Sequence, residues 1–228
     1  LGTGVHVRAG STPTITGGAV QGNKGYAVYT EDLASVSAVN GVAFTGNGKG
    51  VDGAAGTADD AYVMRLSARS AVKLNTFAAT SKAGIELVGG GVTSSFQWFH
   101  PGTGDYQHYV LLQELVVYNL AKLTVDAGVT VKFAQGTGLV IGYYVYGQGQ
   151  VNSVERGQLA VNGTAGAPVL FTALNGQSGG WRGVAFGDAT DYSPMAPSLS
   201  YLTIDQAGEP QTLGGSIGAT SAGLMMFS

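Results

Sequence analysis

The tightest group of chemically capable residues in this 228-residue chain is acidic. Asp52, Asp59 and Asp60 lie in the segment VDGAAGTADDA, with glycines between them. Three carboxylates on such a loop could hold a hard cation, because Ca²⁺ prefers oxygen ligands. Their spacing matches neither an EF-hand loop nor the nonapeptide calcium repeat. We therefore interpret the segment as a solvated surface loop, keep a Ca²⁺ site at these three residues as the alternative, and expect no other cofactor.

Aromatic side chains form the second group of candidate functional residues. They gather in two stretches, FQWFHPGTGDYQHY at 96–109 and YYVYGQGQVNSVER at 143–156. Aromatic rings stack on sugars and anchor protein interfaces, but such rings also simply cover the end of a strand array or pack a loop onto a sheet. If the chain binds a ligand, we expect the contacting rings to be Trp98, Tyr106, Tyr143, Tyr144 and Tyr146.

Other catalytic and metal signatures are weak or missing from the sequence. His100, Asp105 and His108 carry zinc-type ligand groups, but they lie in a Gly-Pro loop at a spacing that fits no helical metal motif. Because the chain has no cysteine, it has no thiol nucleophile and no cysteine-ligated zinc. A Gly-x-Ser-x-Gly elbow and a P-loop are both missing. We therefore predict no catalytic residue.

Composition limits both the fold class and the partners. The chain has 38 glycines, and each glycine inside a helix costs roughly 1 kcal/mol relative to alanine, so a helix bundle is excluded. Apolar residues make up 44% and charged residues 11%, a balance that favours a folded chain over a disordered one. The formal net charge of -3 argues against nucleic acid as a partner. No apolar run approaches the roughly 20 residues that would span a bilayer.

The elements that must position these residues are short strands. Two alternating apolar residues followed by small residues recur in VHVRAG (5–10), IELVGG (85–90), LTVDAG (123–128), LAVNGT (159–164) and LTIDQAG (202–208). Such alternation indicates strands with one buried face, separated by turns. Because the strand starts follow one another at about six to twenty residues, three strands would occupy one circuit of a solenoid.

The alternation and the spacing of the strand starts predict an all-β fold. This fold is a single-stranded parallel β-helix of about nine or ten coils with loop insertions. We expect one domain over residues 1–228, with looser Asn- and Gly-rich coils in 1–90 and more regular coils in 91–228. The predicted inward positions are Leu123, Val125, Val131, Phe133, Leu159, Val161, Val169, Phe171, Val184, Phe186, Leu202 and Ile204, and the predicted outward positions include Thr124, Asp126, Lys132 and Thr203. Neither end shows an amphipathic capping helix, so we expect a longer solenoid or an end-to-end stack.

Between about residues 91 and 208, the motifs GQLAVNGTAGAPVLFTALNG, GGWRGVAFG and LSYLTIDQAG follow one another in this order. In this order the segment resembles the right-handed parallel β-helix repeats of large secreted and surface-anchored bacterial proteins. The resemblance implies a right-handed helix of the pectate-lyase-like type and an extracellular or cell-surface location. It implies no single activity, because the same scaffold carries polysaccharide lyases, adhesins, fibre subunits and inert stalks.

These observations favour a structural and binding role over an enzymatic one. We expect a stalk, adhesin or fibre subunit whose partner is a glycan or a protein at the cell surface, with end-to-end self-association as a further mode. The alternative is a polysaccharide lyase or hydrolase, which would need several carboxylates and a basic residue converging in one groove. A third hypothesis, ice binding, would need a long outward row of threonines, and Thr12, Thr14 and Thr16 supply only a short one.

Overall fold

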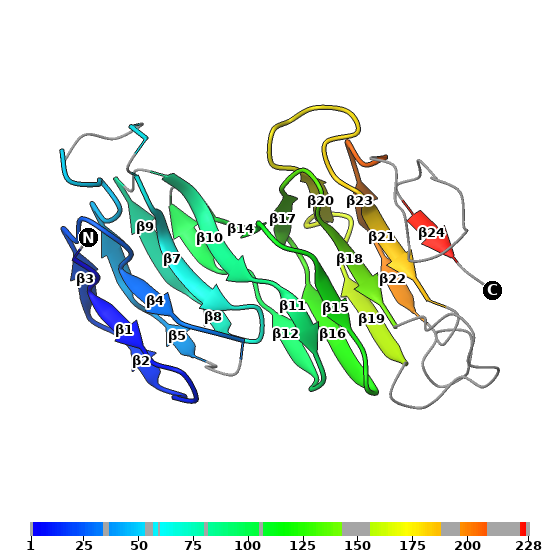
Figure 1. The fold of residues 1–228 in the computed structure, drawn as a ribbon, viewed down its shortest axis with the longest axis horizontal. Coiled ribbons are helices and arrows are strands. Elements are labelled where there is room, and N and C mark those ends of the chain that lie inside the picture. Colours follow the sequence, from blue (N-terminus) through cyan, green and yellow to red (C-terminus); the bar gives the residue numbers. More distant parts are fainter. Residues whose placement is uncertain are drawn as a thin grey trace. The chain divides into compact units, whose positions relative to one another are not determined.

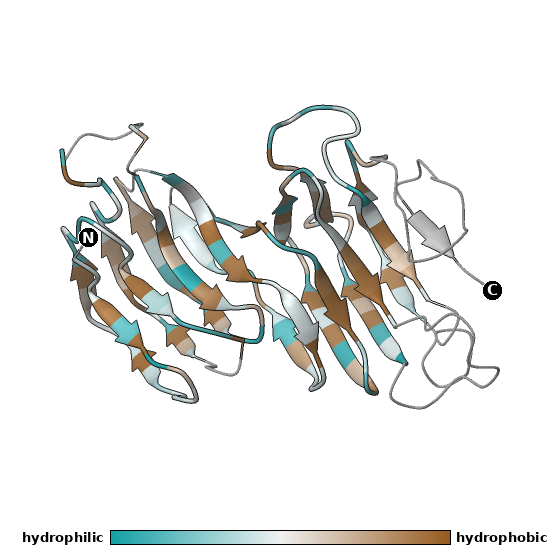
Figure 2. Ribbon diagram, viewed as in Figure 1, coloured by the Kyte–Doolittle hydropathy of each residue, from teal (hydrophilic) through white to brown (hydrophobic). Residues whose placement is uncertain are grey.

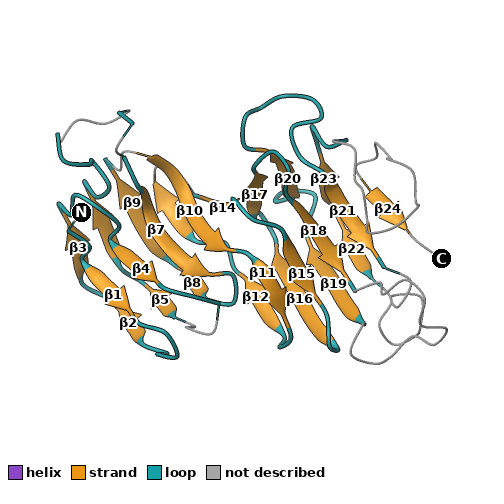
Figure 3. Ribbon diagram, in the orientation of Figure 1, coloured by secondary structure: helices purple, strands orange, loops and turns teal. Residues whose placement is uncertain are grey.

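The fold was determined as a computed structural model. It describes residues 2–33, 37–52, 57–58, 60–79, 82–104, 107–142, 156–187, 197–208 and 224–226, and for residues 83 and 224–226 it describes the backbone alone. Within these ranges all of the regular structure is β-strand, so the predicted all-β class is confirmed (Figure 3). A helix able to cross a membrane does not occur in the described residues.

The chain divides into two compact units. The first comprises Leu1–Val88 and Trp98–Val110, and the second comprises Gly89–Gln97 and Leu111–Ser228. The chain passes from one unit to the other after Val88, Gln97 and Val110. Figure 1 labels the strands of both units.

The first unit contains three parallel sheets. The first sheet has the strand order β1-β4-β7-β10-β14, the second β2-β5-β8, and the third β3-β6-β9-β13. Strands that follow one another along the chain therefore lie in different sheets. From β1 to β7 each strand pairs with the strand three positions later, whereas β9 and β10 pair with β13 and β14, four positions later. The strands are β1 (Val5–Val7), β2 (Thr14–Thr16), β3 (Ala19–Gln21), β4 (Val28–Thr30), β5 (Ala38–Asn40), β6 (Ala43–Thr45), β7 (Tyr62–Ser67), β8 (Ala71–Lys73), β9 (Asn75–Ala78), β10 (Lys82–Val88), β13 (Gly102–Gly104) and β14 (His108–Leu111).

The second unit repeats this arrangement with three further sets of parallel strands. Their orders are β11-β15-β18-β21-β24, β12-β16-β19-β22 and β17-β20-β23. The strands are β11 (Gly90–Val92), β12 (Phe96–Trp98), β15 (Leu115–Val117), β16 (Ala121–Asp126), β17 (Thr130–Phe133), β18 (Gly138–Ile141), β19 (Gly157–Asn162), β20 (Val169–Ala173), β21 (Gly183–Phe186), β22 (Ser198–Ser200), β23 (Leu202–Ile204) and β24 (Leu224–Met226). This order of strands is compatible with a parallel β-helix.

Alternation along the strands decides which side chains form the core. Leu123 and Val125 of β16 pair in register with Leu159 and Val161 of β19, and all four are fully buried. Leu202 and Ile204, on β23, are only half-buried. The other predicted inward positions are also buried, and Figure 2 shows brown apolar and teal polar residues alternating along the strands. The period of two in the sequence therefore predicted the core ladders, because successive side chains on a strand point to opposite faces.

Large aromatic rings fill the interior of both units. In the first unit, Phe44 and Phe77 stack with their ring centroids 5.5 Å apart. In the second, Phe133 stacks on Trp181 at 4.1 Å and meets Phe171 edge-on at 5.7 Å. Phe44 and Phe77 lie on paired parallel strands, as do Phe133 and Phe171, and the spacing of these strands places the rings in contact distance.

Asparagine side chains join successive repeats at the corners of the first unit. The buried Asn47 side chain accepts hydrogen bonds from both the backbone and the side-chain nitrogen of Asn23, at 3.2 and 2.9 Å, and donates one to the Val20 carbonyl at 2.8 Å. The amides of Asn23 and Asn47 therefore satisfy backbone groups that the corner leaves unpaired.

One glycine of the third sheet is required by the close approach of two strands. Gly102 has φ = +152°, and a Cβ atom built there would collide with the carbonyl oxygen of Asn75 on the paired strand β9. A side chain at this position would force the two strands apart, so the pairing of β13 with β9 depends on glycine.

Candidate functional site

Most of the aromatic residues predicted to bind a ligand cannot be placed. Tyr106, Tyr143, Tyr144 and Tyr146 lie outside the described residues. Trp98 is fully buried, its indole nitrogen donates a hydrogen bond to the Ala68 carbonyl at 2.9 Å, and its ring lies 6.1 Å from that of Tyr109. A ring without exposed surface offers no face to a sugar, so the surface role expected for Trp98 does not fit the structure.

The acidic segment is described only in part, because Asp59 lies outside the described residues. Asp52 and Asp60 both reach the Thr57 hydroxyl, at 3.5 and 3.4 Å, and Asp60 also accepts a hydrogen bond from the Thr57 backbone nitrogen at 3.0 Å. These contacts show two carboxylates approaching one hydroxyl. In the described part of the chain, no three His, Cys, Asp or Glu side chains lie close enough to hold a metal ion. The Ca²⁺ site stays a prediction.

The structure brings a different set of residues together on the outer face of the first sheet. His6 on β1 pairs in register with Tyr29 on β4, Tyr29 pairs with Arg65 on β7, and Arg65 pairs with Glu86 on β10. Residues paired in register on parallel strands lie on the same face, so these four side chains form a continuous row across four strands. Tyr26, just before β4, joins this row. We call these five residues the first-sheet face.

A carboxylate lies at the centre of the hydrogen bonding on this face. Glu86 accepts a hydrogen bond from Nε of Arg65 at 2.9 Å on one oxygen and from the hydroxyl of Tyr26 at 2.8 Å on the other. The Arg65 guanidinium also donates to the Thr30 carbonyl at 2.9 Å and lies 5.1 Å from the centre of the Tyr29 ring. The side chains of Arg65 and Glu86 are only 20% and 11% exposed. Both charges are therefore neutralised within the face, and the two tyrosines are held in place around them.

Histidine and a second carboxylate form the outer edge of the face. Nε2 of His6 lies 2.9 Å from Glu31, whose other oxygen accepts a hydrogen bond from the Ala9 backbone nitrogen at 2.8 Å. The imidazole meets the Tyr29 ring edge-on at 5.3 Å. The Tyr29 and Tyr26 rings lie 5.4 Å apart at an interplanar angle of 49°. Half of the His6 side chain remains exposed, so this edge is accessible to a ligand.

Burial and the Glu86 charge act on the tyrosine hydroxyls near this face. Burial first, and then the neighbouring carboxylate, raises the pKa of Tyr62 to about 12. The same two causes, with the hydrogen bond to Glu86, raise the pKa of Tyr26 well above the ordinary tyrosine value. Lys82 lies 4.4 Å from the centre of the Tyr62 ring and covers it. These tyrosines therefore act as neutral hydroxyls and rings, and neither is suited to act as a proton-accepting base.

We expect Tyr62→Phe to reduce the loss of stability at alkaline pH. The unfolded chain releases the tyrosine proton near pH 10, whereas the folded chain retains it to about pH 12. The folded state then binds more protons, so this residue's contribution is complete below about pH 10 and falls as the pH rises above it. Urea unfolding at about pH 8 and about pH 11 should show a shallower decline in the variant than in the wild type. Equal declines would contradict the prediction, and Tyr201→Phe, on a ring exposed at 61%, is the control.

A hollow opens beside the two tyrosines. It measures about 310 Å³ and is lined by Thr3, His6, Gly25, Tyr26 and Tyr29. We call it the tyrosine hollow. The rings give it apolar walls, while the imidazole and the threonine hydroxyl supply hydrogen-bonding groups at its rim. This combination suits a small molecule with one apolar and several polar faces.

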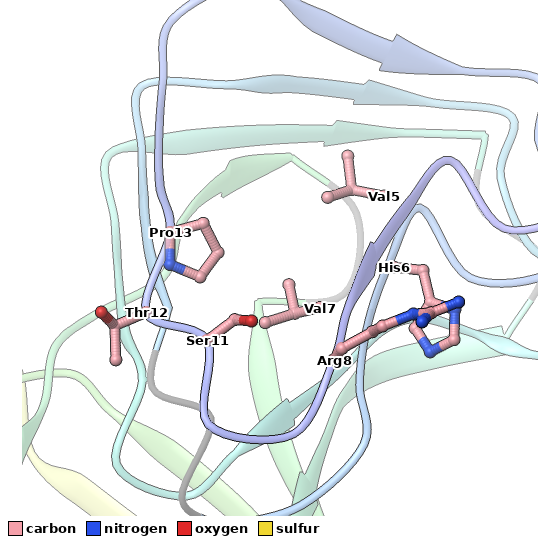
Figure 4. Close-up of a pocket in the computed structure, with 7 residues that line it drawn as sticks. All are labelled: Val5, His6, Val7, Arg8, Ser11, Thr12 and Pro13. Atoms are coloured by element: carbon pink, nitrogen blue, oxygen red, sulfur yellow. The ribbon is translucent and has the colours of Figure 1, made fainter.

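A second hollow, of about 700 Å³, lies along β1 and is lined by Val5, His6, Val7, Arg8, Ser11, Thr12 and Pro13. Figure 4 shows Val5 and Val7 pointing to the side of Ser11 and Pro13, while His6 and Arg8 point the opposite way. Val7 is 2% exposed and Val5 is half-buried, whereas His6 and Arg8 are exposed. The alternation along β1 thus separates an interior lined by valine from a polar outer face that begins at His6.

The sequence carried a partial signal for the first-sheet face. The segments VHV, VYT and YVMRLS each place a polar or aromatic residue between apolar ones, which predicts that His6, Tyr29 and Arg65 point outward. The alternation does not say that these residues are neighbours, because the loops between the strands differ in length. Comparison with known proteins adds no assignment: neither a family model, nor a curated protein, nor a solved structure matches this chain.

Proposed function

We propose that this chain is a single-stranded right-handed parallel β-helix that serves as a structural and binding module of a secreted or cell-surface protein, as a stalk, adhesin or fibre subunit. Its partner would be a glycan or a protein that contacts the outer faces of the sheets. The observation that carries the proposal is the register of the parallel strands, in which apolar ladders occupy the interior and leave a row of paired polar and aromatic side chains outside.

The handedness follows from a general rule about parallel strands. Connections between parallel strands of one sheet are right-handed in about 98% of cases, because a right-twisted strand packs its connection back onto the sheet only that way. The set β1-β4-β7-β10-β14 has five strands, and the set β17-β20-β23 has three. At one coil for each strand, the described residues would form eight coils, whereas the spacing in the sequence predicts nine or ten.

Self-association belongs to the same proposal. β1, β2 and β3 are each the terminal strand of their sheet in the described part of the chain. Terminal strands present backbone donors and acceptors to a further strand, whether it comes from another copy or from another part of a longer protein. An end-to-end stack would continue the interior ladders across that junction.

The arrangement of carboxylates favours binding over catalysis. A polysaccharide lyase of the pectate-lyase-like type would gather several carboxylates and a base that can accept a proton. On the first-sheet face, Glu86 is paired with Arg65 and Glu31 with His6. Both carboxylates are thereby engaged with side chains of the protein itself.

Incubation with polygalacturonate and Ca²⁺ tests the proposal. The absorbance of unsaturated uronic products reports lyase activity, and reducing-end release reports hydrolysis. We expect neither signal above that of heat-denatured protein, together with retention of the native chain on at least one immobilised cell-wall or cell-surface glycan or protein extract. An active lyase supplies the positive control. Product formation that scales with protein concentration would contradict the structural and binding role.

A further inference from the structure

We propose that the tyrosine hollow is a binding site for a neutral carbohydrate, with one hexose ring against Tyr29 and its hydroxyls at His6 and Thr3. This inference rests on the proposed function and names the site and the ligand class within it. All five lining residues come from the same unit, from β1, β4 and the segments that precede them.

The size and walls of the hollow fit one sugar ring. Its volume of about 310 Å³ lies at the lower end of the range of small-molecule sites, which begins near 300 Å³. The Tyr26 and Tyr29 rings, set at 49° to each other, form two walls of a wedge, and Gly25 keeps the space beside them free of a side chain. A sugar ring has one face rich in C–H groups, which packs against an aromatic ring, while its hydroxyls point to the edge.

The walls are held in place before any ligand arrives. The Tyr26 hydroxyl is fixed by its 2.8 Å hydrogen bond to Glu86, and the Arg65 guanidinium lies 5.1 Å from the centre of the Tyr29 ring. Arg65 is itself fixed by Glu86 and by the Thr30 carbonyl. Binding therefore costs little ordering of side chains, which is the main entropic penalty for an exposed aromatic site.

The charges around the hollow select for a neutral ligand. Arg65 lies 5.1 Å from the centre of the Tyr29 ring, and its charge is paired with Glu86. His6, at the rim, faces Glu31 at 2.9 Å. A uronic acid would bring a further carboxylate close to those of Glu86 and Glu31, which are already engaged with Arg65 and His6. A neutral hexose meets only hydrogen-bonding groups and ring faces, so it avoids this repulsion.

Titration calorimetry on the full chain tests the site. The probes are the neutral hexasaccharides of β-1,4-glucose, β-1,4-mannose and α-1,4-glucose, together with hexagalacturonate as the acidic counterpart. We expect at least one neutral probe to bind and hexagalacturonate to bind more weakly. Tyr29→Ala should lower the affinity at least about tenfold, equivalent to roughly 1.4 kcal/mol. Tyr201→Ala, which removes an exposed tyrosine of the other unit, should leave the affinity unchanged.

Two further variants separate loss of the site from loss of the fold. Tyr29→Phe keeps the ring face and should bind within about twofold of the wild type. Thr3→Trp should block the hollow without touching the core, and its circular dichroism should match that of the wild type. The inference would be overturned if hexagalacturonate bound more tightly than the neutral probes, if no neutral probe bound, or if Tyr29→Ala and Thr3→Trp kept the affinity of the wild type. If the neutral probes bind both variants as tightly as the wild type, the hollow is not the binding site but the proposed function stands. If the protein releases sugar products, the proposed function itself is overturned.

Discussion

Replacing Trp181 with alanine should lower the free energy of unfolding by about 3–5 kcal/mol, the range measured for aromatic deletions in well-packed cores. Trp181 is fully buried and stacks on Phe133 at 4.1 Å and 11°. Its indole nitrogen also donates a hydrogen bond to the Asp205 carbonyl at 2.8 Å. The alanine variant therefore loses the apolar contacts, leaves a cavity between strands and leaves that carbonyl without this donor.

Denaturant unfolding followed by far-ultraviolet circular dichroism measures this loss, since the signal does not depend on the removed indole. Trp181→Phe keeps part of the stacking and should cost less than the alanine variant. Tyr201→Ala, on a ring 61% exposed, should change stability by no more than about 0.5 kcal/mol. A loss below about 1 kcal/mol in Trp181→Ala would mean that Trp181 does not support the core of the second unit.

Replacing Asn75 with leucine, a side chain of similar size, should cost about 2–4 kcal/mol. Asn75 is 1% exposed, and its amide oxygen accepts a hydrogen bond from the Val42 backbone nitrogen at 2.9 Å. Its amide nitrogen donates to the carbonyls of Val39 and Pro101, at 3.1 and 3.2 Å. Leucine would leave the buried Val42 N–H without this acceptor, and an unsatisfied buried donor carries the full desolvation penalty.

The same denaturant titration checks this prediction, with Asn162→Leu as the matched control because Asn162 is exposed at the end of β19. The control should stay within about 0.5 kcal/mol of the wild type. Asn75→Asp keeps the acceptor, but an ionised carboxylate cannot donate to the two carbonyls. We therefore expect this variant to be destabilised at neutral pH and partly restored as the pH falls and the buried carboxyl becomes protonated. An Asn75→Leu chain as stable as the wild type would show that these hydrogen bonds are replaceable.

The alternation of apolar residues predicted most of the core. Leu123, Val125, Leu159 and Val161 are buried in register because a strand's side chains alternate between its two faces. The same rule accounts for the burial of Trp98. In the stretch FQW, Phe96 and Trp98 are buried and Gln97 is half-buried, as expected for an alternating strand. A buried Trp98 leaves no ring face for a ligand.

The first-sheet face shows the opposite situation. Each strand's pattern indicated that His6, Tyr29 and Arg65 point outward, but their register across three strands depends on how much chain each intervening loop takes up. The sequence of one strand does not show which residue of the next strand will lie beside it. Loops of different lengths can return the chain to the same position in the sheet. Glu86 reaches both Arg65 and Tyr26 only once these strands have paired.

By itself, the amino-acid sequence determined the all-β class, the absence of thiol chemistry and the identity of most inward-facing residues. These properties depend on composition and on a period of two, which act over a few residues. The tertiary structure alone decided which outer side chains meet, which groups the buried Asn75 amide bonds, and that a hollow forms beside Tyr26 and Tyr29. Those outcomes depend on strand register, which is set by the packing of many distant residues at once.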